Sequence, residues 1–236
     1  TRIKVGFNNL AIIGDVAYYN DSPLKLRGVT YNPVYNELGE LLTEQDIKRD
    51  FALIKEYGFD TIQPLHEVSA EFMRYAEEFG LFVIPRLGVN TKGLEKINEK
   101  KRNAVVAEPS FEELIKNVVM YSFGRDRNLP NVLFYQFVED GNAPVIKKCV
   151  ELLKANTTKP VFAYGDNGDV ISACYPSING VIDLINEAMN KKPVFFTKYA
   201  LLVTVDLPYS FYDLATRKGF FIVKKIPFCL PKARFS

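Results

Sequence analysis

The stretch that most constrains the fold of this chain runs from Asn128 to Gly141, with the sequence NLPNVLFYQFVEDG. It begins at a turn signal that includes Pro130, continues with residues that are apolar on both alternating sets of positions, and ends with two carboxylates, Glu139 and Asp140. Such a run predicts a strand covered on both faces, as in a parallel sheet under helices. We therefore expect polar chemistry at its C-terminal end, where the loops of parallel α/β proteins gather.

Runs of the same kind alternate with amphipathic helical patterns along the chain. We predict eight strands, at 24–33, 59–65, 81–89, 128–141, 160–166, 169–176, 193–200 and 219–228. Helices are predicted at 43–58, 69–80, 110–124, 143–156, 178–191 and 208–217, and a polar, lysine-rich loop at 90–109. Thr43 and Ser69 suit helix N-caps, and Gly58 suits a helix end.

This alternation predicts an α/β protein, a (β/α)8 TIM barrel in which some helices are short or missing. The link between the fifth and sixth strands has no room for a helix. An open, doubly wound sheet is an alternative, although no glycine fingerprint follows an early strand. Residues 1–23 hold two extended runs around Asn8 and Asn9, which suggest a small hairpin at the bottom of the barrel. We expect one domain over residues 1–236.

Composition excludes several classes of function. The formal net charge is +2, and basic residues are scattered, which argues against a nucleic-acid partner. No run approaches about 18 apolar residues, so no membrane span is expected. Cys149, Cys174 and Cys229 are far apart and His66 is the single histidine, so neither a metal site nor a cofactor is expected. The compartment stays open.

Taken in order, these motifs resemble the catalytic TIM barrel domain of glycoside hydrolase family 2, the group of β-galactosidases, β-glucuronidases and β-mannosidases within clan A. LRGVTYNP resembles the family's first strand, and RDFALIKEYGFDTIQPLHEVSAEFMRYAEEFGLFVIPRLGV resembles its second unit and third strand, with His66 on the family histidine. NLPNVLFYQFVEDG resembles HPSVxxWSxGNE, DVISACYP resembles the sixth strand with its tyrosine, and KPVFFTKYA resembles KPxxxxEYA. The matches cover about residues 25–200.

The resemblance implies a retaining glycosidase, which needs two carboxyl groups about 5–5.5 Å apart. It places the general acid/base at Glu139, or at Asp140 if the alignment slips by one. The nucleophile position falls on Lys198, whose ammonium cannot form the glycosyl ester. His66, Asp140, Tyr175 and Tyr199 are implied as substrate-binding residues.

Other departures from the family pattern point the same way. Val138 stands where an asparagine is expected, Gln63 where an arginine is expected, and Tyr135 where a tryptophan is expected; the chain has no tryptophan. Lys224 and Lys225 occupy the eighth strand. We therefore expect a glycosidase-like barrel that is catalytically impaired and serves as a carbohydrate-binding or structural module, as one part of a larger chain.

Several alternatives remain open at this point. Glu139 can act as an acid or form an ion pair with Lys198 across the barrel mouth. Lys198 can itself serve as a base or Schiff-base lysine. The protein can be an active hydrolase that combines Glu139 with a non-standard second carboxylate such as Glu67 or Asp166, or a protein-interaction scaffold without a sugar site.

Overall fold

The fold is a ring of parallel strands surrounded by helices. A computed structural model describes residues 6–34, 40–87, 98–140, 144–164, 166–174, 177–200 and 221–224. The ring is formed by β4 (Arg27–Tyr31), β5 (Thr61–Pro64), β6 (Phe82–Val83) with β7 (Arg86–Leu87), β8 (Tyr135–Asp140), β9 (Val161–Tyr164), β11 (Ile171–Cys174), β12 (Val194–Ala200) and β13 (Phe221–Lys224). β6 and β7 are two pieces of the predicted third strand, separated at Ile84 and Pro85, because proline has no N–H for the ladder.

Pairing between the strands closes the ring. One sheet has the order β11-β12-β13-β4-β5-β6 and the other contains β7, β8 and β9, and all these pairs are parallel. A parallel bridge between Val83 and Val132 joins the two sheets on one side. On the other side, Ser172 Oγ of β11 donates to the Ala163 carbonyl of β9 at 2.8 Å. The predicted (β/α)8 TIM barrel is thereby confirmed.

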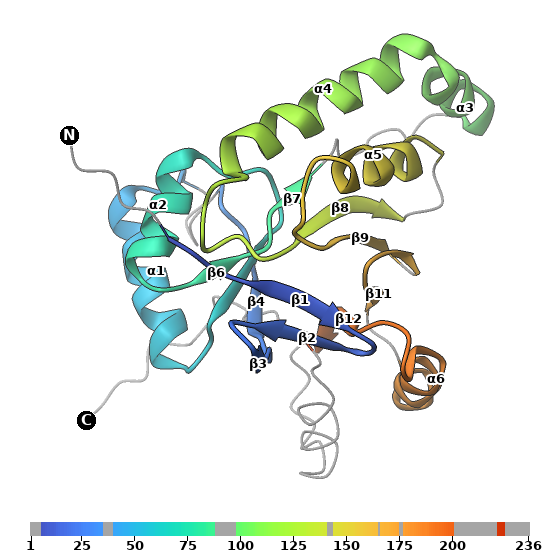
Figure 1. The fold of residues 1–236 in the computed structure, drawn as a ribbon. Coiled ribbons are helices and arrows are strands. Elements are labelled where there is room, and N and C mark those ends of the chain that lie inside the picture. The colour runs from blue at the N-terminus through green and yellow to red at the C-terminus, as the bar shows by residue number, and fades with distance from the viewer. Residues whose placement is uncertain are drawn as a thin grey trace.

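Helices lie around the outside of the strands (Figure 1). They are α1 (Glu44–Glu56), α2 (Ala70–Glu78), α3 (Glu99–Ala107), α4 (Pro109–Asp126), α5 (Pro144–Lys154) and α6 (Ile178–Ala188). The predicted caps are confirmed: Thr43 and Asp46 form a capping box, the Ser69 hydroxyl accepts from Phe72 N–H, and Gly58 follows α1 at φ +76°. The described part of the chain contains no helix with the length and apolar character needed to span a bilayer.

Helix α3 lies inside the segment that we predicted as a polar loop. Its sequence, EKKRNAVVA, is made mostly of residues that favour helix, and Asn98 Oδ1 accepts from Lys100 N–H at 2.8 Å as the N-cap. The prediction was wrong because this helix has no apolar stripe, which is the signal that periodicity detects. The helix predicted at 208–217 lies outside the described residues.

The N-terminal hairpin turns at a different place from the one expected. β1 (Leu10–Ile13) pairs antiparallel with β2 (Val16–Tyr19), and β3 (Ser22–Pro23) follows. The turn therefore lies at Gly14 and Asp15 rather than at Asn8 and Asn9. Gly14 has φ +61°, a conformation that glycine adopts without steric cost, and this requirement places the turn.

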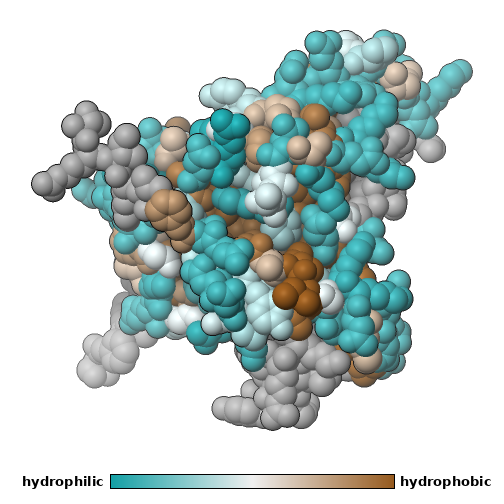
Figure 2. Space-filling model, viewed as in Figure 1, coloured by the Kyte–Doolittle hydropathy of each residue, from teal (hydrophilic) through white to brown (hydrophobic). Residues whose placement is uncertain are grey.

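The hairpin covers the end of the barrel where the strands begin. Its Ala17 belongs to a buried cluster whose other members lie in or near the lower parts of the barrel strands, and Leu10, Ile12 and Tyr19 of the hairpin pack against this cluster. The other members are Leu24, Leu26, Ile84, Leu133, Phe134, Phe162, Val170 and Phe195. The rings of Phe162 and Phe195 lie 4.9 Å apart. In Figure 2, seen from the same side, the most apolar surface lies over the hairpin, where Ile13 is 67% exposed. The strand starts are thus sealed, which leaves the strand ends for chemistry.

The connection from β9 to β11 contains a tight turn in place of a helix, as predicted. β10 (Asn167–Gly168) runs back along β9 in antiparallel pairing. Asp169 then ties the link down: Oδ2 accepts from Val161 N–H at 2.9 Å, and Oδ1 accepts from Lys154 Nζ at 2.5 Å. Gly168 has φ +136°, and a Cβ there would lie 2.2 Å from the Val161 carbonyl oxygen.

We predict that Gly168→Ala destabilises the protein by roughly 2–5 kcal/mol, because strain and a backbone clash add. Gly80→Ala is the matched control, since Gly80 also has a positive φ, +63°, but no heavy atom lies within 4 Å of its added Cβ. It should cost only about 1 kcal/mol. Urea unfolding monitored by circular dichroism measures both values, and equal costs would contradict the clash.

A buried hydrogen bond fixes α1 against β4. Tyr31 Oη donates to Asp50 Oδ2 at 2.8 Å, and Asp50 is 5% exposed. Burial raises the pKa of the Asp50 carboxyl above its ordinary value, while the Tyr31 bond acts in the opposite direction. The Tyr31 hydroxyl, together with the Arg49 guanidinium 3.4 Å from Asp50 Oδ1, therefore favours the ionised carboxylate.

We predict that Tyr31→Phe costs about 1–3 kcal/mol at neutral pH, because Asp50 loses its buried donor. Without that bond the pKa of the Asp50 carboxyl in the folded state rises further. The folded state then binds more protons than the unfolded state above about pH 4. The loss of stability should therefore grow as the pH rises from about 4 to about 8. In an Asp50→Asn background, urea unfolding should show the same cost at both pH values; a pH-dependent cost there would count against Asp50 as its source.

Candidate functional site

The candidate site is the barrel mouth, where the parallel strands end. Glu139 and Asp140 are the last two residues of β8, and Lys198 and Tyr199 lie in the last three residues of β12. Only the backbone of these four residues is described, and Tyr175 lies outside the described residues. The ion pair of Glu139 with Lys198 therefore stays a prediction.

Strand register brings these positions to one edge of the barrel. Asp140 pairs with Tyr164 at the end of β9, and Cys174 at the end of β11 pairs with Lys198. The register shifts just before each of these pairs, between Gln136 and Asp140 and between Ala173 and Cys174. Such irregularities are common next to active sites, where they redirect a side chain.

A chain of neutral polar side chains lies inside the barrel below the mouth. Thr30 Oγ1 of β4 donates to Gln63 Oε1 at 3.5 Å, and Gln63 Nε2 of β5 donates to Gln136 Oε1 of β8. All three residues are buried. Gln63 is the position at which the family resemblance expects an arginine, so the described interior carries an amide where a cation was expected.

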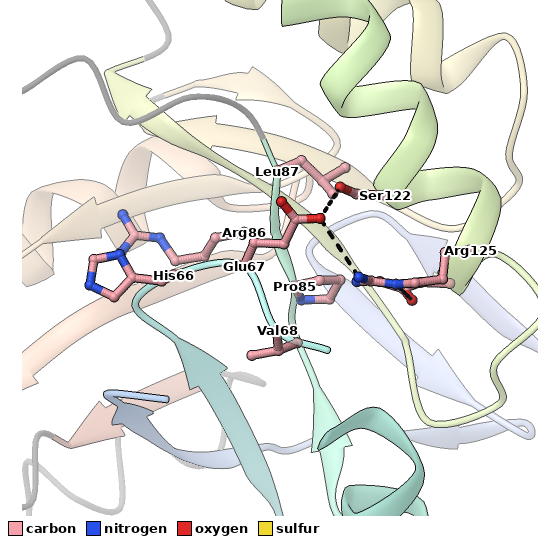
Figure 3. A pocket seen from close by; sticks show the side chains of 9 residues that line it. His66, Glu67, Val68, Pro85, Arg86, Leu87, Ser122 and Arg125 are labelled. Atoms are coloured by element: carbon pink, nitrogen blue, oxygen red, sulfur yellow. Dashed lines mark hydrogen bonds and ion pairs between the residues drawn. The ribbon is translucent and has the colours of Figure 1, made fainter. Parts of the chain in front are cut away.

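His66 is exposed in the loop between β5 and α2, beside a small recess. The recess is lined by His66, Glu67, Val68, Pro85, Arg86, Leu87, Ser122, Arg125 and Asp126 (Figure 3). In this view Glu67 points toward α4, away from the His66 ring. His66 is thus near the strand ends, and its role as a sugar ligand stays a prediction.

Glu67 is engaged by α4. Its Oε1 accepts from Ser122 Oγ at 2.6 Å and lies 3.7 Å from Arg125 Nη1. Arg125 in turn forms two bonds of 2.7 Å to Asp126, which is fully buried. The recess therefore borders an ion-pair network in which Arg125 contacts two carboxylates.

The second alternative carboxylate, Asp166, is also paired. Its Oδ1 lies 2.5 Å from Lys192 Nζ. Glu67 and Asp166 thus each lie against a basic side chain.

Lys159 is a partly buried lysine whose pKa is lowered by burial. That pKa is about 8, and Lys159 Nζ donates to the Leu129 carbonyl at 2.9 Å. This lysine precedes β9, at the end of the barrel opposite the mouth. It therefore cannot supply the Schiff-base chemistry considered for Lys198. No group of three or more histidine, cysteine, aspartate or glutamate residues suited to a metal ion occurs among the described residues.

Sequence analysis missed two residues at or near this end of the barrel, Gln136 and Tyr164. Both follow from strand alternation: Gln136 is two residues beyond the buried Phe134, and Tyr164 is two residues beyond the buried Phe162. The alternation was masked because both strands are apolar on both faces.

A comparison with protein families gives one match. Residues 10–200 match the model of the TIM barrel domain of glycosyl hydrolases family 2. The β-galactosidase of Staphylococcus xylosus is 24% identical over 230 residues, and the alignment covers 84% of this chain and 22% of that protein. The β-galactosidase of Vibrio vulnificus strain YJ016 is 30% identical over 95 residues, or 40% of this chain and 9% of that protein.

Solved structures show the same fold at low identity. A family 2 β-galacturonidase from Eisenbergiella tayi, bound to galacturonate, has a TM-score of 0.69 at 16% identity and covers 94% of this chain and 47% of that chain. A family 2 member from Bacteroides cellulosilyticus has a TM-score of 0.70 at 17% identity, with 93% and 30% covered. This chain thus spans about a fifth of the first β-galactosidase and about half of the β-galacturonidase.

We predict that Arg125→Met destabilises the protein by roughly 3–5 kcal/mol, because the buried Asp126 carboxylate loses its partner. Lys116→Met on the same helix is the control. Lys116 pairs with Glu112 at an exposed site, and Glu112 keeps its second partner, Lys148, at 2.8 Å. That change should cost less than about 1 kcal/mol. Thermal unfolding compares the two variants, and a similar fall in Tm would refute the structural role of Arg125.

Proposed function

Because the chain belongs to family 2 of the glycosyl hydrolases through its TIM barrel domain, we propose that it is a carbohydrate-binding barrel with impaired hydrolysis. The observation that carries this proposal is Lys198 at the end of β12, the position that the resemblance gives to the nucleophile. A retaining glycosidase needs a carboxylate there to form the glycosyl ester. An ammonium group cannot replace it.

The surrounding residues support this proposal. Gln63 replaces an expected arginine and is bonded to a second neutral amide, Gln136. The two described alternatives for a second carboxylate, Glu67 and Asp166, are each held by a basic side chain. An active hydrolase working through Glu139 and another carboxylate is the alternative, and a protein-interaction scaffold is the third candidate.

The names of the similar proteins suggest which sugars to test. They include β-galactosidases and a β-galacturonidase bound to galacturonate. We therefore propose β-galactosides and β-galacturonides as the first ligand classes. We also propose that the barrel is one module of a larger protein, because the similar proteins extend well beyond the region it matches.

We predict no steady release of nitrophenol from nitrophenyl β-galactoside or β-galacturonide by the wild-type protein. Lys198→Glu should restore the missing carboxylate and raise the rate at least about tenfold, a gain of about 1.4 kcal/mol in transition-state stabilisation. The absorbance of released nitrophenol at saturating substrate measures the rates of the wild type and of Lys198→Glu.

Two further variants identify the general acid/base, and a third serves as the control for the gain in rate. In the Lys198→Glu background, Glu139→Gln and Asp140→Asn should be compared, because only the true acid/base should abolish the gain. Lys224→Glu adds a carboxylate on the neighbouring strand and should leave the rate unchanged. Wild-type turnover that Glu139→Gln abolishes would favour the active hydrolase instead, and equal rates for wild type and Lys198→Glu would count against Lys198 at the nucleophile position.

A further inference from the structure

Tyr164 is an exposed aromatic residue at the end of a barrel strand. It closes β9 and is 45% exposed, while the three residues before it are buried. Exposed tyrosines on helices are common, but an exposed ring on a barrel strand needs an explanation, because strand residues otherwise lie under helices or inside the barrel. Among the described residues with large exposed apolar side chains, Tyr164 alone belongs to the ring of parallel strands.

The alternation of β9 assigns Tyr164 to the inner face. Val161 and Ala163 pack in the cluster that includes the helices α1, α2, α4 and α5, which cover the outside. Phe162 packs in the cluster inside the barrel. Successive residues of a strand point to opposite faces, so Tyr164 shares the inner face with Phe162 and lies one layer higher, at the mouth.

Register places Tyr164 between the two positions on which the proposed function depends. It pairs with Asp140 on β8. On its other side, Ser172 Oγ bonds to the carbonyl of Ala163, the residue before Tyr164, and two residues later Cys174 pairs with Lys198. Among the described residues with exposed aromatic side chains, Tyr164 is therefore the one that pairs directly with the acid position.

Sugar rings present faces of C–H groups that pack well on aromatic rings, which combine apolar area with a negative π face. Tryptophan commonly fills this role, and the chain has none. Tyr164, which is 45% exposed, offers aromatic surface to solvent at the end of β9.

We propose that Tyr164 is the platform on which a pyranose ring stacks in the leaving-group half of the sugar site. The inference rests on the proposed function and adds to that function the size of the ligand. Because the acid position serves the leaving-group oxygen, the sugar on Tyr164 is the second of two linked rings. The ligand class is therefore a disaccharide or a longer saccharide rather than a monosaccharide.

The test is isothermal titration of the purified protein with lactose and a β-linked galacturonosyl disaccharide, each compared with galactose and galacturonate. The wild type should bind at least one disaccharide more tightly than the matching monosaccharide. Tyr164→Ala should weaken disaccharide binding about tenfold, the equivalent of about 1.4 kcal/mol, and leave the monosaccharide within about twofold. Tyr164→Phe keeps the ring and should stay within about threefold of the wild type.

Tyr57→Ala is the matched control, because Tyr57 is 59% exposed and ends α1, just before the start of β5 and so at the end of the barrel opposite the mouth. It should bind like the wild type, and circular dichroism should show that all variants are folded. A folded Tyr164→Ala with unchanged disaccharide affinity overturns this inference and leaves the proposed function standing. A wild type that binds none of the four sugars overturns both.

Discussion

Filling the inside of the barrel is the constraint on which the rest of the structure depends. A ring of parallel strands is stable only if its interior is packed, and here Phe134, Phe162 and Phe195 occupy the lower part. The N-terminal hairpin covers them from below. Above them, apolar packing gives way to Thr30, Gln63 and Gln136, which satisfy one another by hydrogen bonds. One end of the barrel is therefore closed by hydrophobic burial and the other is polar.

Much of this architecture could be predicted from the sequence because its signals are local. Thr43, Ser69 and Gly58 mark helix ends through hydrogen bonds to residues only a few positions away, and the strand runs are recognisable by their β-branched and aromatic residues. Helix α3 was not predicted because it lacks an apolar stripe. The hairpin turn was predicted at the wrong place because the turn forms at Gly14, which has a positive φ, and not at the asparagine pair.

The candidate site was predictable only in part, since its geometry depends on contacts between strands distant in sequence. Motif order placed Glu139, Asp140 and Lys198 at strand ends, and the described backbone agrees with these positions. The engagement of Glu67 by Ser122 and Arg125 on α4 could not be anticipated, because it joins segments more than fifty residues apart. Tyr164 was missed because β9 is apolar on both faces, which hides the alternation of its residues.

The link between β9 and β11 has a consequence for molecular recognition. Gly168 allows β10 to approach β9 more closely than any other residue would, and Asp169 anchors the first residue of β9 and the end of α5. A saccharide arriving at the edge of β9 would meet a backbone that is already held in place, so little conformational entropy would remain to be lost on association. A short, anchored turn thus stands here in place of a crossover helix. It covers less of the sheet, but it holds the backbone of this part of the ring in position.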